Sequence, residues 1–311
     1  MKICLHIGAH KAASSTIQKN LRINKDIIFK KYGINYVVPG EIDLHRSPID
    51  MHFRRVSKYV ILQGTEEYLE SINEAKVYLD NIIDSLPDSK ILLLSWEGFL
   101  GHSNMSIHAG IYTHHKSVSD SIYKIFGKQT SILLLTRRQD EFLESCYLQQ
   151  MKELRTMEFS EFLAPIEINK LHWSDIIDSF NNIHVVHFES IKSLGTKKFI
   201  ELCISCLTGI NFSMDEMKII QKTNASIGIK GSEINKELLP LIGKADRGVF
   251  GNIIFRNFSS NKYGKAKFFN DFHRRLIIEV CKDKNIELIN SHLEEIEGYD
   301  SDYYTNTISN K

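Results

Sequence analysis

Residues 5–20 read L-H-I-G-A-H-K-A-A-S-S-T-I-Q-K-N, and the fold is decided in this stretch. The apolar run 3–7 stops at Gly8, which is the pattern of a short buried strand. Ser14 or Ser15 can then cap a helix whose apolar residues recur on one side. The sequence therefore predicts a strand, a turn of small residues and the N-terminus of a helix, in that order.

The turn between this strand and this helix has the composition of a phosphate-binding loop. Small residues keep side chains away from the backbone, so successive N–H groups can point at one anion, assisted by the helix dipole. Three hydroxyls and one lysine add further donors. The residues expected to bind an anion are Ala9, Lys11, Ala12, Ala13, Ser14, Ser15 and Thr16. The alternative is a tight turn in which a serine only caps the helix.

This loop differs from a Walker A loop, which reads G-x-x-x-x-G-K-[ST]. Counted from Gly8, the second glycine position holds Ala13 and the lysine position holds Ser14, while the lysine of this chain is Lys11. A site for a nucleoside triphosphate with Mg²⁺ is therefore disfavoured.

Further along the chain, short apolar runs alternate with helical patterns. Strands that are apolar on both faces and are separated by helices are typical of a parallel sheet covered on both sides. The further strands expected are 34–38, 90–95, 130–136 and 183–188, and further helices are expected over 65–86, 117–126, 139–152 and 264–283. In the last of these helices, Phe268, Phe272, Leu276 and Val280 have the spacing of a buried face.

The predicted fold class is therefore α/β, with a central parallel sheet of about five strands flanked by helices. No linker, repeat or long charge block divides the chain, so we expect one domain over residues 1–311. Within it, 1–195 is expected to form the α/β nucleotide-binding part. Residues 196–311 are expected to form a mainly helical part that covers the substrate side.

The composition is that of an ordinary globular protein. The chain has 311 residues, with 39 Lys or Arg against 38 Asp or Glu, and its formal net charge is +1. Bulk attraction to nucleic acid is therefore not expected. No apolar run approaches the roughly 18 residues of a membrane-spanning helix. We expect a soluble, cytoplasmic protein with no transmembrane segment, and leave peripheral membrane contact and the oligomeric state open.

Neither the cysteines nor the histidines have metal-ligand spacing. The five cysteines are scattered, and the pair Cys203-x-x-Cys206 lies in an apolar run without a second such pair. We interpret these two as buried thiols. The histidines within 102–115 match no compact zinc pattern. No metal site is therefore expected.

The stretch H-K-A-A-S-S-T-I-Q at 10–18 resembles the 5′-phosphosulfate loop of sulfotransferases that use 3′-phosphoadenosine 5′-phosphosulfate (PAPS). It is closest to the bacterial branch, which typically reads H-K-T-G-S-S-T-L-Q. Ala13 departs from that pattern, which has glycine there, and its methyl group is tolerable if the local φ is negative. The resemblance implies a P-loop-like sulfotransferase fold, PAPS as the sulfuryl donor, release of adenosine 3′,5′-bisphosphate and no required metal.

A second stretch, R-R-Q-D-E-F-L-E-S at 137–145, resembles the 3′-phosphate motif of the same family. That motif has an arginine at a strand end and a serine eight residues later, which implies that Arg137 and Ser145 bind the donor. The guanidinium of an arginine offers a phosphate several N–H donors in a planar fork, and a serine on the next helix can reach the same anion. The alternative is a charged helix start in which the arginines pair with Asp140 or Glu141.

Sulfuryl transfer needs a cation where negative charge grows on the leaving oxygen, and a base that accepts the acceptor's proton. By resemblance, the cation is Lys11. The leading candidate for the base is Glu97, which follows the strand 90–95 in S-W-E, at the sheet edge where ligands of parallel sheets bind. His10, next to Lys11, is the rival base. The choice between these two stays open at this point.

The function expected from these residues is transfer of a sulfuryl group from PAPS to a hydroxyl of a carbohydrate or glycolipid. The segment 40–60 is locally basic and suits an anionic acceptor. It contains His45, Arg46, His52, Arg54 and Arg55. The alternative for this segment is an amphipathic helix whose arginines face water. The alternatives for the chain are a P-loop-type kinase and a non-catalytic relative that binds a nucleotide or glycan.

Overall fold

We analysed a computed structural model of the chain. It describes residues 1–37, 46–86, 89–104, 109–153, 155, 157–221, 226–243, 245–292 and 302–305. His45 of the predicted acceptor segment lies outside these residues.

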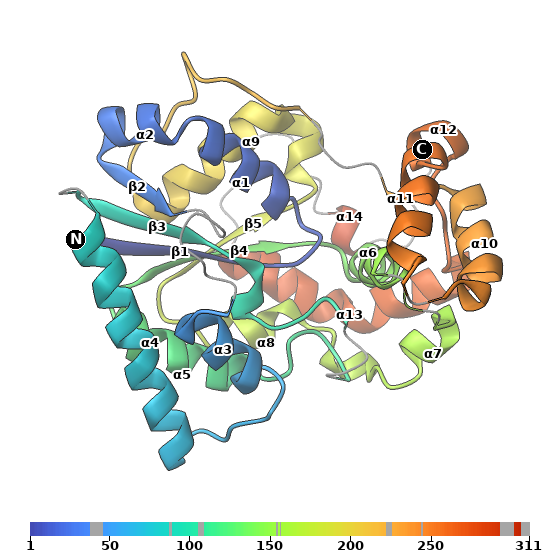
Figure 1. Ribbon diagram of the computed structural model, residues 1–311, viewed down its shortest axis with the longest axis horizontal. Helices are drawn as coiled ribbons and strands as arrows, with labels where there is room; N and C mark the ends of the chain where they lie inside the picture. Colours follow the sequence, from blue (N-terminus) through green and yellow to red (C-terminus); the bar gives the residue numbers. More distant parts are fainter. Residues whose placement is uncertain are drawn as a thin grey trace.

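A five-stranded parallel sheet forms the centre of the molecule (Figure 1). Its strands are β1 (Lys2–Gly8), β2 (Ile34–Val37), β3 (Ile91–Ser95), β4 (Ser131–Thr136) and β5 (Ile183–His187). The strand order is β2-β3-β1-β4-β5, and every pairing is parallel. All residues of β3 and β4 are buried, as expected for strands covered on both faces. The α/β prediction and its five strands are confirmed.

Helices cover both faces of the sheet (Figure 1). One face carries α1 (Ser14–Ile23), α2 (Lys25–Tyr32) and α9 (Ser190–Thr208), and the other carries α3 (Pro48–Val56), α4 (Glu66–Ser85), α5 (His115–Phe126) and α8 (Trp173–Ile177). The helix expected after the first strand is divided in two at Asn24. The expected division of the domain after residue 195 falls inside α9, at a glycine with φ 73° and non-helical geometry.

The remaining helices pack beside the carboxyl ends of the strands. They are α6 (Gln139–Lys152), α7 (Phe159–Leu163), α10 (Ile229–Leu238), α11 (Arg247–Asn257), α12 (Ser260–Tyr263), α13 (Asp271–His292) and α14 (Asp302–Thr305), with the 3₁₀ turns η1 (Glu97–Phe99), η3 (Ile168–Lys170) and η4 (Leu239–Leu241). The C-terminal part is joined to α6 by a buried carboxylate, because Glu144 accepts hydrogen bonds from the backbone N–H groups of Phe268 and Phe269.

The predicted buried face of α13 is wrong. The helix begins at Asp271, so Phe268 precedes it, and Phe272 is 69% exposed. The side chains that are buried belong instead to Ile277, Ile278, Cys281 and Leu288. This helix has apolar residues on two faces, and the spacing alone did not show which face packs against α6 and α8.

Among the residues that the structure describes, no helix has both the length and the apolar character needed to cross a membrane.

Candidate anion-binding site at the carboxyl ends of β1 and β4

The strand order predicts where a ligand binds. After β1, the next two strands of the chain, β2 and β3, lie on one side of β1 in the sheet. After β4, the next strand, β5, lies on the opposite side. In an open parallel sheet, ligands bind at such a switch point, outside the carboxyl ends of the two strands. The predicted anion loop follows β1 and the predicted arginine follows β4. Two motifs far apart in the sequence therefore meet at one edge of the sheet.

The loop 9–16 wraps into the N-terminus of α1. Ala9 donates its backbone N–H to Leu135 of β4 at 3.0 Å, and His10 donates its own to the Tyr112 hydroxyl at 2.9 Å. The backbone N–H groups of residues 11–15 donate to no residue that the structure describes. Unpaired donors at a helix N-terminus are the arrangement that binds phosphate-like anions.

Ala13 has a left-handed backbone. Its φ is 70° and its ψ is 7°, so the condition of a negative φ is not met. A methyl group in this region costs about 1–2 kcal/mol, which glycine avoids. The glycine of the pattern that this loop resembles therefore has a physical reason, and this chain bears a backbone strain there. Lys11 also has a positive φ, 62°.

Lys11 extends from the loop toward α6. Its Nζ donates a 3.2 Å hydrogen bond to Oε1 of Gln149. Burial lowers the pKa of Lys11, and the nearby charges of Lys152 and Arg137 act in the same direction. An ammonium group held among other cations is a strong attractor for an anion, because the anion would relieve their mutual repulsion.

Arg137 lies directly against this loop. Its Nη1 donates to the carbonyl oxygen of Lys11 at 2.9 Å, and its Nη2 donates to Glu141 at 2.8 Å. Its Nε is buried and has no hydrogen-bond partner among the described residues, and its guanidinium stacks on Phe188 at 4.7 Å. The guanidinium is therefore held beside the loop by two hydrogen bonds and by the ring of Phe188.

Glu141 is a competing anion at this position. Burial alone would raise the pKa of Glu141, but the charges of Lys265 and Arg137 outweigh burial and hold the pKa well below its usual range. Lys265 approaches the carboxylate to 3.7 Å. The pairing of Arg137 with Glu141 is the contact named in the alternative interpretation of this motif. It occurs here together with the contact between Arg137 and the anion loop.

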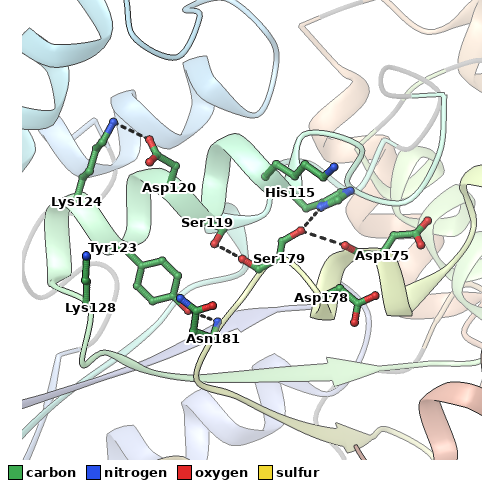
Figure 2. Close-up of a pocket in the computed structure, with 11 residues that line it drawn as sticks. His115, Ser119, Asp120, Tyr123, Lys124, Lys128, Asp175, Asp178, Ser179 and Asn181 are labelled. Atoms are coloured by element: carbon green, nitrogen blue, oxygen red, sulfur yellow. Dashed lines mark hydrogen bonds and ion pairs between the residues drawn. The ribbon is translucent and has the colours of Figure 1, made fainter. Parts of the chain in front are cut away.

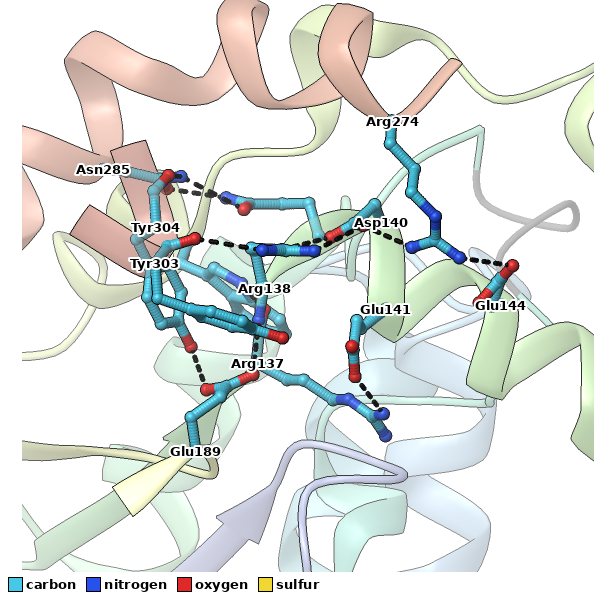
Figure 3. A network of polar contacts seen from close by, with 12 residues as sticks. Arg137, Arg138, Asp140, Glu141, Glu144, Glu189, Arg274, Asn285, Tyr303 and Tyr304 are labelled. Carbon is cyan, nitrogen blue, oxygen red and sulfur yellow. Dashed lines mark hydrogen bonds and ion pairs between the residues drawn. The ribbon is translucent and has the colours of Figure 1, made fainter. Parts of the chain in front are cut away.

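The neighbouring arginine has a structural role (Figure 3). Arg138 pairs with the buried Asp140 through two hydrogen bonds of 2.7 and 2.9 Å, and its guanidinium stacks on Tyr303 at 4.1 Å. Its backbone N–H donates to Glu189, which also accepts from the Tyr304 hydroxyl. These contacts fix α14 beside the end of β4 and leave Arg137 as the arginine that faces the loop.

The hydroxyl residues of the two motifs have different positions. Ser14 is buried and donates to the carbonyl oxygen of Ala9 at 3.2 Å, so it closes the loop internally. Ser15 is exposed and Thr16 is half-buried at the start of α1. Ser145 is half-buried on α6, and its hydroxyl forms no hydrogen bond within the described part of the chain.

Glu97 lies at the end of β3, the strand beside β1. It begins the turn η1, is half-buried, and accepts a 3.3 Å hydrogen bond from Nε2 of Gln18 on α1. Its charge acts on both His6 and Lys11. The structure therefore brings this carboxylate to the same edge of the sheet as the anion loop.

His10 is held by Tyr112, a buried residue that the sequence did not single out. The Tyr112 hydroxyl accepts the backbone N–H of His10 and lies 2.8 Å from the ring Nδ1. Because no other acceptor among the described residues contacts the hydroxyl, its proton points to Nδ1, which makes Nδ1 an acceptor and puts the ring proton on Nε2. Burial also lowers the pKa of His10 to about 3. The ring is therefore a neutral donor toward solvent.

Tyr112, Gln149, Glu141 and Lys265 contact the site but were not predicted to bind or react. Glu141 had a sequence signal, because it lies one turn after Arg137. The other three are brought in by long-range packing and had none.

In the predicted acceptor segment, two arginines form ion pairs with acidic residues. Arg54 binds Asp50 at 2.7 Å, and Arg55 binds Glu67. His52 is buried and pairs with Ser71. Two arginines that were expected to attract an anionic acceptor therefore have carboxylate partners.

A surface hollow of about 920 Å³ lies elsewhere, along α5 (Figure 2). Its walls include Lys124, Asp120, Asp175 and Ser179. Acidic and basic groups alternate there, and Lys124 pairs with Asp120 at 2.9 Å. We assign no ligand to it. Among the described residues, no group of three or more His, Cys, Asp or Glu could hold a metal ion.

No family model matches this chain, and no curated protein matches its sequence. Among solved structures, the chain is similar to the crystal structure of a sulfotransferase from Alicyclobacillus acidocaldarius. The two share 14% identity with a TM-score of 0.43, over 79% of this chain and 98% of that chain.

Proposed function

We propose that this protein is a sulfotransferase that transfers a sulfuryl group from PAPS to a hydroxyl of an acceptor. The observation that carries the proposal is the contact between the two predicted phosphate motifs. Arg137 binds the backbone of Lys11 at the switch point of the sheet. Two anion-binding elements at one edge suit a ligand with phosphate groups at both ends of a nucleoside.

The donor fits the groups that are available. The free N–H groups of 11–15 and the cation of Lys11 suit the 5′-phosphosulfate. The guanidinium of Arg137 and the hydroxyl of Ser145 suit the 3′-phosphate. When bound, PAPS supplies the sulfuryl group and a bridging oxygen on which negative charge grows. Lys11 would stabilise that charge as the bond to sulfur breaks.

Glu97 is our candidate for the base that accepts the hydroxyl proton. It has the position for this role, and the hydrogen bond from Tyr112 makes His10 a poor acceptor. His10 would instead donate from Nε2 to an oxygen of the transferring group. The balanced reaction leaves a sulfated acceptor, adenosine 3′,5′-bisphosphate and one proton.

For the acceptor, we propose a carbohydrate or glycolipid. The support is the positive charge near the loop, because Lys152 acts electrostatically on Lys11 and Lys58 acts on the neighbouring His102. These groups suit an acidic saccharide or a sugar on a phosphate carrier. Arg54 and Arg55 contribute less to this proposal, since each has an acidic partner.

Two measurements test the proposal. Calorimetry should show adenosine 3′,5′-bisphosphate binding at about micromolar affinity without Mg²⁺, equivalent to roughly −8 kcal/mol. Incubation with sulfur-labelled PAPS and a panel of saccharides and glycolipids should give a labelled acceptor, which Glu97→Gln should abolish while bisphosphate binding persists. Preference for ATP with Mg²⁺ would favour a P-loop-type kinase. Binding of the bisphosphate without any transfer would favour a non-catalytic nucleotide- or glycan-binding protein.

A further inference from the structure

The helical C-terminal part has large apolar side chains that face solvent. On α11, Val249 is 65% exposed and Ile253 is 51% exposed, and these two residues lie one turn apart on the same face. On the preceding α10 and its turn η4, Leu238 is 43% exposed and Leu241 is 79% exposed. The helices α10 and α11 pack on each other at one end of the molecule (Figure 1).

The segment that contains α11 carries only positive charges. Residues 247–270 contain five Lys or Arg and no Asp or Glu, in a chain whose formal net charge is only +1. Arg256 follows Ile253 on the exposed side of α11, and Lys262 and Lys267 are exposed just beyond it. Arg256 and Lys267 form no ion pair or hydrogen bond with any residue that the structure describes. These cations are therefore free to bind a partner.

The exposed apolar faces of α4 and α13 do not share this charge. On α4, Leu69 is 52% exposed and Val77 is 54% exposed, but that helix has six acidic residues and one lysine. On α13, the exposed Phe272 and Leu276 share their face with Glu279 and Asp283. Charge thus distinguishes the α11 surface from the exposed apolar faces of α4 and α13.

We propose that α11 and the basic segment after it dock on the surface of an anionic phospholipid bilayer. A helix with exposed apolar side chains and Lys or Arg beside them lies in the plane of a membrane interface, and its cations meet the lipid phosphates. Leu241, Val249 and Ile253 would enter the interface, while Arg256, Lys262 and Lys267 bind headgroups. The contact is peripheral.

This inference does not rest on the proposed function. None of these six residues belongs to the loop 9–16 or contacts Arg137, so membrane docking and bisphosphate binding can fail separately. If both hold, docking would bring the enzyme to acceptors that are attached to lipid.

Vesicle sedimentation tests the proposal. The full chain should sediment with vesicles of mixed phosphatidylcholine and phosphatidylglycerol, and bind pure phosphatidylcholine at least about tenfold more weakly. Binding to the mixed vesicles should weaken as salt is added. Equal binding to both kinds of vesicle, or to neither, would overturn the proposal.

Matched variants distinguish binding through this surface from non-specific adsorption of the protein to vesicles. Val249→Ser with Ile253→Ser should lower vesicle binding about tenfold, since two apolar side chains no longer enter the interface. The control, Leu69→Ser with Val77→Ser, replaces residues of similar exposure on the acidic α4 and should change nothing. Arg256→Gln with Lys262→Gln and Lys267→Gln should flatten the salt dependence.

Other occupants of this surface give different results. A second copy of the chain would make the Val249→Ser, Ile253→Ser variant change the mass measured by light scattering without vesicles. A soluble anionic polymer would displace the vesicles completely and leave the apolar double variant as well bound as the original. Either result would contradict docking on a bilayer.

Discussion

Nη1 of Arg137 donates a 2.9 Å hydrogen bond to the carbonyl oxygen of Lys11, and so joins the segment after β4 to the loop after β1. The contact fixes the guanidinium beside the loop before any ligand binds. It also leaves the Lys11 side chain free to extend toward α6, where Gln149 accepts a hydrogen bond from it. An anion that reaches both residues would meet donors that are already oriented, which lowers the entropic cost of binding.

The two residues should have separable roles. Lys11→Ala should lower turnover with PAPS about a hundredfold or more while changing bisphosphate affinity little, because the charge of Lys11 matters most when negative charge grows on the leaving oxygen. Arg137→Ala should weaken bisphosphate binding at least about tenfold. Calorimetry and initial rates measure the two effects. Equal, small losses in both variants would show that the site is misplaced.

Glu141 should compete with the ligand for Arg137. Glu141→Gln keeps the shape of the side chain and removes the negative charge 2.8 Å from Nη2, so bisphosphate affinity should rise about three- to tenfold. The matched control is Glu167→Gln, since Glu167 is exposed and pairs with Lys170 instead. Weaker binding in Glu141→Gln would mean that the carboxylate is needed to orient the arginine.

The sequence was sufficient for the architecture because each strand is a short apolar run that ends at a turn. Runs such as 130–136 need both faces covered, which only a parallel sheet between helices provides. The sequence also placed Lys11, Glu97 and Arg137 at the carboxyl edge of the sheet, because each comes shortly after the end of a predicted strand. Tyr112 and Gln149, which contact His10 and Lys11, could not be predicted in this way, because they reach the site through tertiary packing. The sequence could not show which face of α13 is buried, because Leu276 and Ile277 are adjacent and equally apolar.

The backbone at Ala13 was also beyond prediction, because a left-handed φ depends on the closure of the loop. Ala13→Gly should raise the free energy of unfolding by about 0.5–1 kcal/mol, since glycine removes the strain of the left-handed conformation but loses more backbone entropy on folding. Urea denaturation measures the change. The control is the buried Ala12→Gly, whose φ is not positive and whose substitution should destabilise the protein. Destabilisation by both substitutions would contradict the argument.

Three buried histidines should make the protein unstable in acid. His6, His52 and His187 are at most 1% exposed, and each places Nδ1 against a hydroxyl, of Ser95, Ser71 and Thr136 respectively. Burial lowers the pKa of His6 and of His52 to about 4, and that of His187 to about 3. The pKa of all three is close to 6.5 in the unfolded chain.

The sign follows from where the protons bind. Above pH 6.5 both states are neutral, so the contribution to stability is complete. Below about 6.5, the unfolded chain binds protons that the folded chain does not, and the free energy of unfolding falls until the folded pKa is reached. Each histidine contributes a slope of about 1.4 kcal/mol per pH unit within this window.

Urea denaturation between pH 7 and pH 5 should therefore show a steep loss of stability. His187→Gln should make the slope shallower by about 1.4 kcal/mol per pH unit, because one fewer buried imidazole then resists protonation. His273→Gln, at an exposed position on α13, is the control and should leave the slope as it is. A pH-independent midpoint in the original protein would show that these rings are protonated in the folded state, and would contradict their burial as neutral groups.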